Sequence, residues 1–75
     1  MTGTYMYTVK IIENRCPHIV IQLQDANGRE QWWVMSMLDY DVLCKKYNTQ
    51  NFCGVELKSL PERGKLINEF DLAFL

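Results

Sequence analysis

Apolar residues in the middle of the chain are arranged in the manner of two β-strands. Residues 18–24 are rich in β-branched side chains, and residues 30–36 combine the adjacent aromatics Trp32 and Trp33 with valine and methionine. β-Branched and aromatic residues favour strands, and a short polar segment separates the two stretches. The pattern therefore predicts a β-hairpin over residues 18–36, around which we expect the rest of the chain to be built.

The polar segment between these strands, residues 25–29, is compatible with two turns. A two-residue turn would place Asp25 opposite Glu30, where two like charges repel each other. A three-residue loop with a bulge at Gly28 would place Asp25 opposite Arg29 and would use Asp25 as a turn residue. We favour the bulged loop because it removes the repulsion.

The choice between the two turns decides which tryptophan is buried, because a one-residue slip exchanges the faces of a strand. The bulged loop puts Trp33 on the face shared by Ile19, Ile21 and Leu23, and the tight turn puts Trp32 there. In either register the two tryptophans point to opposite faces. A sheet with one polar face does not place a second large aromatic on that face, so we expect the outer face to be covered by another segment or used for binding.

The first strand is predicted over residues 4–13, where side chains alternate between two faces. Met6 and Ile12 fall on the outer face. The alternation assigns the opposite set to the core: Tyr5, Tyr7, Val9 and Ile11. Residues 14–17 break this strand, because Pro17 has no amide proton to contribute to a ladder. Strands one and two should therefore form a hairpin of their own.

A helix is predicted to begin at Ser36, whose hydroxyl can accept a hydrogen bond from the amide of Asp39. Two lysines near residue 46 fall in its last turn, where positive charge favours the helix dipole. Its apolar stripe has helical spacing and consists of Tyr40, Leu43, Cys44 and Tyr47. A helix of about three turns is marginal alone in water, so this stripe should pack on the sheet.

The C-terminal third of the chain predicts a second hairpin. Residues 52–58 have the pattern of a strand, Pro61 and Gly64 suit a turn, and residues 65–74 alternate like a final strand. The same apolar residues also fit one face of a helix, so the alternative is a second helix over residues 60–74. Periodicity does not decide between the two.

These elements predict a single domain over residues 1–75 of the α+β class. Its core would be an antiparallel β-sheet of about five strands, in the order β-β-β-α-β-β, with one helix packed on a face. Because one helix covers only one face, the other face should expose an apolar patch. The residues expected in that patch are Met6, Ile12, Val20, Trp32 and Val34.

Composition and charge narrow the function classes. The chain has 48% hydrophobic residues and a formal net charge of −1, which places it among compact folded chains. Its basic residues form no clustered stripe, so nucleic-acid binding is not expected. No apolar run is long enough to cross a membrane. The chain has three cysteines, an odd number that does not suggest a set of disulfides, and its sequence shows no signal-peptide pattern. We therefore expect a cytoplasmic protein with free thiols.

The chain offers little material for catalysis or metal binding. His18 is the single histidine, and it lies two residues after Cys16. If the segment were extended, the two side chains would share a face and could form a thiolate–imidazole pair. Because Cys16 is expected in a loop and Pro17 lies between the two residues, we do not expect this pair to be catalytic. Three cysteines and one histidine equal the number of ligands of a tetrahedral zinc site. The spacing does not fit such a site, because Cys44 and Cys53 have no second ligand two to four residues away in the sequence. We expect Cys44 and Cys53 to be buried, Cys16 to be exposed, and no enzyme activity, cofactor or metal.

The leading hypothesis is a small non-enzymatic protein-binding module that masks or bridges a partner protein. Small motif-free chains of this kind are typical of phage or mobile-element inhibitors of a host defence system such as a CRISPR complex, an analogy of type only. The alternative is a single-stranded nucleic-acid-binding module with exposed aromatics on the sheet. The residues expected to bind the partner are Trp32, Val20, Val34, Met6, Tyr40 and Asp41. The apolar patch also favours a homodimer, which would leave Tyr40 and Asp41 for another partner.

Overall fold

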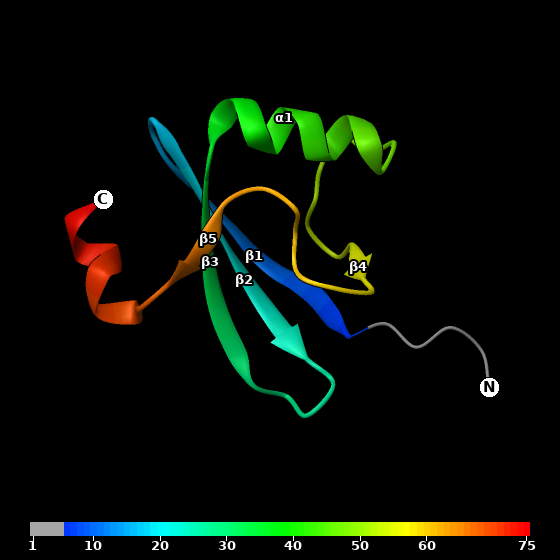
Figure 1. The fold of residues 1–75 in the computed structure, drawn as a ribbon, viewed down its shortest axis with the longest axis horizontal. Coiled ribbons are helices and arrows are strands. Elements are labelled where there is room, and N and C mark those ends of the chain that lie inside the picture. Colours follow the sequence, from blue (N-terminus) through cyan, green and yellow to red (C-terminus); the bar gives the residue numbers. More distant parts are fainter. Residues whose placement is uncertain (1–5) are drawn as a thin grey trace.

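The computed structural model describes residues 6–75, which form one antiparallel sheet with a helix across one face (Figure 1). The elements follow the chain in the order β1 (Tyr7–Arg15), β2 (His18–Asp25), β3 (Glu30–Ser36), α1 (Met37–Lys46), β4 (Glu56–Leu57), β5 (Lys65–Ile67) and the 3₁₀ helix η1 (Glu69–Phe74). The strand order across the sheet is β4-β1-β2-β3-β5. The predicted α+β fold with five strands and one main helix is confirmed.

The turn between β2 and β3 is the bulged loop. Gln24 lies opposite Glu30 and the amide of Asp25 donates to the carbonyl of Arg29 at 2.9 Å, so Asp25 faces Arg29. The Asp25 carboxylate accepts hydrogen bonds from the amides of Asn27 and Arg29, which makes it the turn residue that the sequence predicted. Gly28 follows with φ +84°. This register places Trp33 on the inner face, as expected.

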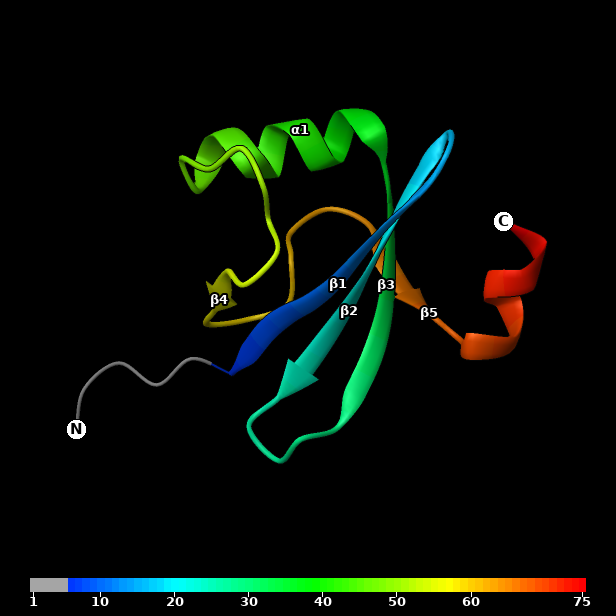
Figure 2. The same ribbon diagram turned by 180° about the vertical axis from the view of Figure 1, so that it is seen from behind.

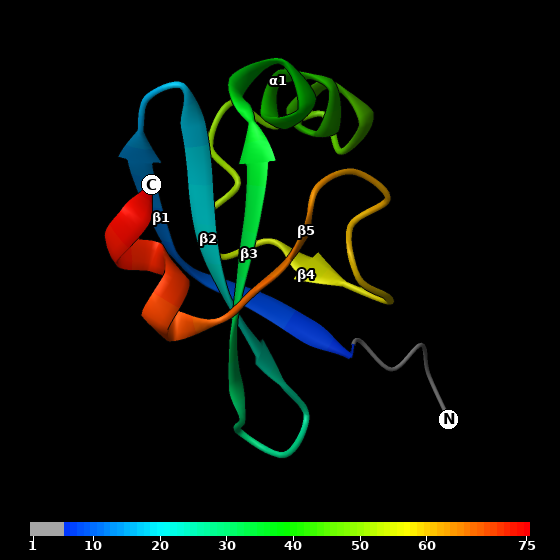
Figure 3. The same ribbon diagram turned by 60° about the vertical axis from the view of Figure 1, so that its left-hand side comes forward.

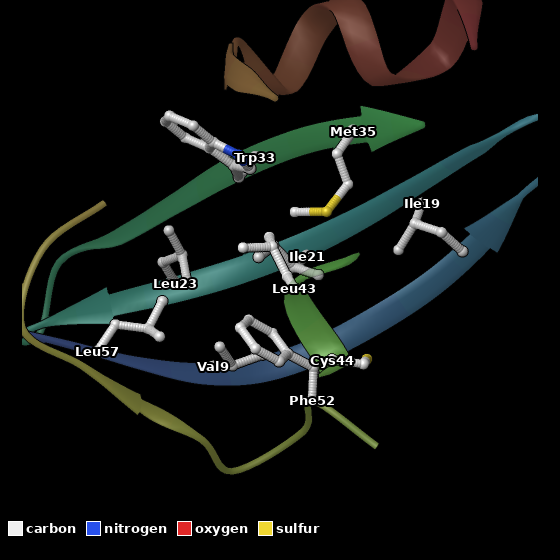
Figure 4. Packing of buried hydrophobic residues seen from close by; sticks show 10 residues of the cluster. All are labelled: Val9, Ile19, Ile21, Leu23, Trp33, Met35, Leu43, Cys44, Phe52 and Leu57. Carbon is white, nitrogen blue, oxygen red and sulfur yellow. The ribbon is translucent and has the colours of Figure 1, made fainter. Parts of the chain in front are cut away.

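The inner face of the sheet carries the core, shown in Figure 4. α1 packs across this face against β2 and β3 (Figure 2). The buried residues of this cluster are Val9, Ile19, Ile21, Leu23, Trp33, Met35, Leu43, Cys44, Phe52 and Leu57. Apolar burial of this extent supplies the main driving force for folding.

α1 begins where the sequence predicted. The hydroxyl of Ser36 accepts a hydrogen bond from the amide of Asp39 at 3.1 Å, and the backbone of Ser36 is extended, as an N-cap requires. Leu43 and Cys44 are buried against the sheet, and Tyr40 is half-buried beside them. The predicted apolar stripe is confirmed for these three residues, whereas Tyr47 lies at the C-cap and is 40% exposed.

Phe52 enters the core from a loop. The predicted strand over residues 52–58 is reduced to Glu56–Leu57, and Phe52 lies before it with its side chain fully buried. The Phe52 ring forms T-shaped pairs with two tyrosine rings, with 6.1 Å between ring centroids for Tyr40 and 5.5 Å for Tyr47. A loop residue can replace a strand residue here because α1 and its C-cap supply the two aromatic rings that surround it.

The face assignment predicted for the first strand is wrong beyond Val9. Val9 lies opposite Leu23 and Ile11 opposite Gln22, so Lys10 has no partner and forms a β-bulge. The extra residue shifts the alternation, which turns Ile11 outward, where it is 43% exposed, and packs Ile12 against the core. Residues 4 and 5 of the predicted strand lie outside the described residues.

The C-terminal segment follows neither prediction over its full length. The predicted strand over residues 65–74 is correct only for Lys65–Ile67, and the alternative helix over residues 60–74 is limited to Glu69–Phe74. Between them Asn68 is extended, and its side chain accepts a hydrogen bond from the amide of Phe70 at 3.0 Å. The asparagine therefore ends the strand and caps the 3₁₀ helix.

Candidate functional site

The sheet face opposite α1, here called the outer face, is organised in rows of directly opposed residues. The pairing of the strands places Ile11 opposite Gln22, Gln22 opposite Trp32, and Trp32 opposite Ile67. The next row contains Glu13, Val20, Val34 and Lys65. Because opposed residues share a face, each row crosses the sheet as a line of neighbouring side chains.

The row that contains Val20 and Val34 is covered by η1. Leu72 packs against both valines, which are 0% and 4% exposed. The Arg15 guanidinium donates a hydrogen bond to the carbonyl of Leu72 at 2.6 Å, and Arg15 also pairs with Glu13 at 3.1 Å. Figure 3 shows η1 against the sheet and away from α1.

The predicted exposure of Val20 and Val34 is therefore wrong, as is the assignment of Ile12 to the outer face. Both valines lie beneath Leu72, because the chain supplies its own cover for the middle of this face. Ile12 is turned inward by the bulge at Lys10. The open part of the outer face is smaller than the sequence predicted.

Trp32 stays accessible beside this cover. It is half-buried, packs against the valine and leucine cluster, and borders a hollow of about 310 Å³. Two carboxylates, those of Glu30 and Glu69, line the hollow, and no lysine or arginine does. We call this site the Trp32 hollow; its lining is Gln22, Glu30, Gln31, Trp32, Leu66, Ile67 and Glu69. An indole next to two negative charges suits a cationic group better than an anion.

The other three residues predicted to bind a partner lie apart from the hollow. Met6 is exposed near the far edge of the sheet, where its amide donates to the carbonyl of Leu57 in β4. Asp41 is exposed on α1 and pairs with Lys45 at 3.1 Å. Tyr40, also on α1, lies on the inner face. The structure thus joins Trp32, Val20 and Val34 in one cluster and does not bring Met6, Tyr40 or Asp41 to it.

Tyr40 has a structural role on the inner face. Its hydroxyl accepts a hydrogen bond from the amide of Phe52 at 3.3 Å. Burial raises the pKa of Tyr40; the hydrogen bond from Phe52 acts in the opposite direction, and the neighbouring Cys44 adds to the rise. The neutral phenol is therefore the form that the folded protein favours.

Alkaline pH should consequently weaken the fold through Tyr40. A folded-state pKa above the ordinary value of about 10 means that this stabilisation is complete below pH 10 and is lost as the pH rises through the folded pKa. We expect the midpoint of thermal unfolding to fall above about pH 10 more steeply for the natural chain than for Tyr40→Phe. Equal slopes for the two proteins would rule out this role of Tyr40.

A second hollow was missed by sequence reasoning because neither prediction, a strand over residues 65–74 or a helix over residues 60–74, divides the segment between a strand and a helix. This C-terminal groove of about 880 Å³ lies between β5, η1 and the end of β3. Phe74, Leu66 and Leu75 contribute apolar lining, and His18 lines it too, with a buried Nδ1 atom that has no hydrogen-bond partner among the described residues. The signal in the sequence was Asn68, a good helix N-cap followed by acidic residues.

The cysteines and the remaining surface offer few reactive groups within residues 6–75. Cys16 and Cys53 are exposed and Cys44 is buried, so the expected burial of Cys53 is wrong. In that same range no three cysteine, histidine or acidic side chains are grouped as metal ligands would be. Neither described helix is long and apolar enough to span a membrane.

Comparison with protein families, curated proteins and solved structures finds no match to this chain.

Proposed function

We propose that this chain is a non-enzymatic protein-binding module that binds its partner through the Trp32 hollow. The observation that carries the proposal is an accessible tryptophan beside a hollow rimmed by Glu30 and Glu69, on a sheet face whose middle is covered by Leu72. The partner surface that fits this site presents an arginine or lysine side chain next to an apolar one. Binding would mask that surface.

The chemistry of the hollow supports a cationic side chain. A cation over an indole face contributes about 0.5–2 kcal/mol, depending on how far the contact excludes water. The carboxylates of Glu30 and Glu69 add charge complementarity, which raises the association rate and selects against acidic surfaces. Tryptophan and arginine are also the residue types that most often dominate binding energy at protein interfaces.

The acidic rim argues against the nucleic-acid alternative. Single-stranded nucleic acids bind where exposed aromatics stand next to basic residues that contact phosphates. Here the residues around Trp32 supply two negative charges and no positive one. Labelled single-stranded DNA or RNA, titrated at two salt concentrations, should show no binding at physiological salt; salt-dependent binding in the micromolar range would reverse this ranking.

The proposed mode of action is occupation of a partner surface. This is the mode expected of a phage or mobile-element inhibitor of a host defence complex, and we propose it for a cytoplasmic protein of this size. The proposal needs no cofactor and no catalytic residue. It requires only that the partner present the cationic and apolar side chains described above.

The test immobilises the natural chain, Trp32→Ala and the double variant Glu30→Gln with Glu69→Gln, and exposes each of them to the same native cell extract. A true partner should be captured by the natural chain and by the control Leu38→Ala, which removes an exposed apolar side chain on α1. With that partner purified, Trp32→Ala should raise the Kd about 30-fold, as loss of about 2 kcal/mol implies. The double glutamine variant should raise the Kd as well.

The glutamine variants keep the test independent of folding. Glu30 and Glu69 are both exposed, so their amides should leave the unfolding midpoint unchanged. If every captured protein binds Trp32→Ala as tightly as the natural chain, the hollow is not the binding site and the proposal is wrong.

A further inference from the structure

We propose that the C-terminal groove binds a second copy of this chain, with the two copies related by a two-fold axis. The groove adjoins the Trp32 hollow and shares Leu66 and Ile67 with it, but Trp32 and the two glutamates of the hollow do not line the groove, so the inference does not depend on the proposed function. Three features support it: an exposed aromatic side chain, a hollow beside that side chain, and two opposite charges that form no ion pair among residues 6–75.

The apolar part is a nearly uncovered aromatic side chain. Phe74 on η1 is 86% exposed and Leu66 on β5 is 58% exposed, yet both line the same hollow of about 880 Å³. Soluble chains rarely expose such residues side by side unless the patch is an interaction surface. The projecting ring and the hollow adjoin each other, so the Phe74 ring of one copy can enter the groove of the other while the reverse contact forms.

The charges are arranged for the same symmetry. Lys65 and Asp71 both line the groove, and neither forms an ion pair among residues 6–75. A two-fold axis makes every contact occur twice with exchanged roles. Lys65 of each copy would therefore meet Asp71 of the other, which neutralises all four charges.

A second copy fits this patch better than an unrelated ligand does. A ligand of one sign would leave either Lys65 or Asp71 unpaired, whereas a second copy supplies both charges and an exposed aromatic ring to fill the hollow. β5 has only three residues, so strand pairing along the edge of the sheet would contribute little. The contact would be made by side chains around the groove.

The first test compares two phenylalanines of η1. Light scattering over a concentration series should show the natural chain reaching a dimer mass, and Phe74→Ser should weaken dimerisation at least about tenfold. The matched control is Phe70→Ser, because Phe70 is 82% exposed on the same helix but does not line the groove. A natural chain that stays monomeric up to millimolar concentration, or equal effects of the two variants, would overturn the inference.

The second test uses charge reversal, which does not disturb the core because both residues are exposed. Lys65→Glu and Asp71→Lys should each weaken dimerisation, since each places like charges across the axis. The double variant should regain most of the lost association, because the reversed charges again pair between copies. A double variant as weak as the two single effects combined would contradict this interface. Trp32 does not line the groove, so Trp32→Ala should leave dimerisation unchanged, which keeps the failure of one proposal distinguishable from the failure of the other although the two sites share Leu66 and Ile67.

Discussion

Replacement of Phe52 by alanine should lower the free energy of unfolding by about 3–5 kcal/mol. Phe52 is 0% exposed, and its ring fills the space between β1, the loop and α1. Its removal would leave a cavity next to Tyr40 and Tyr47, whose rings form T-shaped pairs with the Phe52 ring. Because a domain of this size is stabilised by roughly 5–10 kcal/mol, this loss is a large share of the total.

Urea denaturation followed by circular dichroism measures this effect, with Phe70→Ala as the matched control. Phe70 is 82% exposed, so its removal should change the free energy of unfolding by no more than about 0.5 kcal/mol. The experiment should be run at low protein concentration, where self-association does not contribute. If both alanine variants lose the same stability, Phe52 does not occupy the buried position described.

Substitution of Gly64 by alanine should be the most damaging change outside the core, with an expected loss of about 3 kcal/mol. Gly64 has φ +94°, a conformation that strains any residue with a Cβ atom. A Cβ atom built there would lie 2.5 Å from the carbonyl oxygen of Val34 and 2.5 Å from Nε1 of Trp33. The backbone oxygen cannot move without separating β5 from β3.

Gly28→Ala separates the two causes of this loss. Gly28 also has a positive φ, +84°, but a Cβ atom there would meet nothing within 4 Å. It should therefore lose only the conformational part, about 1–2 kcal/mol. Thermal or urea unfolding of the two variants should show the larger loss for Gly64→Ala; equal losses would mean that the chain does not approach β3 closely at residue 64.

The central hairpin could be predicted because local chemistry determines it. Asp25 can satisfy two amides of the turn only in the bulged loop, and that loop also separates Asp25 from Glu30. The register of β2 and β3, and the burial of Trp33 instead of Trp32, follow from this turn alone. α1 was predictable for the same reason, since its cap and its apolar stripe are local features.

The bulge in β1 could not be predicted from the alternation of that strand. It is stabilised by a distant segment: the amide of Gly54 donates to the carbonyl of Val9 at 2.8 Å, and the amide of Val9 donates to the carbonyl of Val55. These bonds hold the strand at Val9, and the extra residue Lys10 has no pairing partner in β2. An apolar pair such as Ile11 and Ile12 fits either face until the bulge decides which side chain is buried.

The candidate site was predicted in part. The sequence placed Trp32 on the outer face and indicated that this face is either covered by another segment or used for binding. It did not show that Leu72 is the residue that covers the two valines. The apolar residues of the C-terminal segment fit a strand and a helix equally well, and the outcome depends on the Asn68 cap and on the Arg15 hydrogen bond to Leu72. Arg15 lies 57 residues away from Leu72 in the sequence, so no local pattern reveals this contact.

The accessibility of Trp32, beside the two valines that Leu72 covers, is most directly tested by hydroxyl-radical footprinting with mass spectrometry. At low protein concentration we expect oxidation of Trp32, Phe70 and Phe74, and protection of Trp33 and Phe52. At high concentration Phe74 should become protected while Phe70 and Trp32 stay reactive. Protection of Trp32 equal to that of Trp33 at low concentration would contradict the account, because the outer face would then have no open aromatic site.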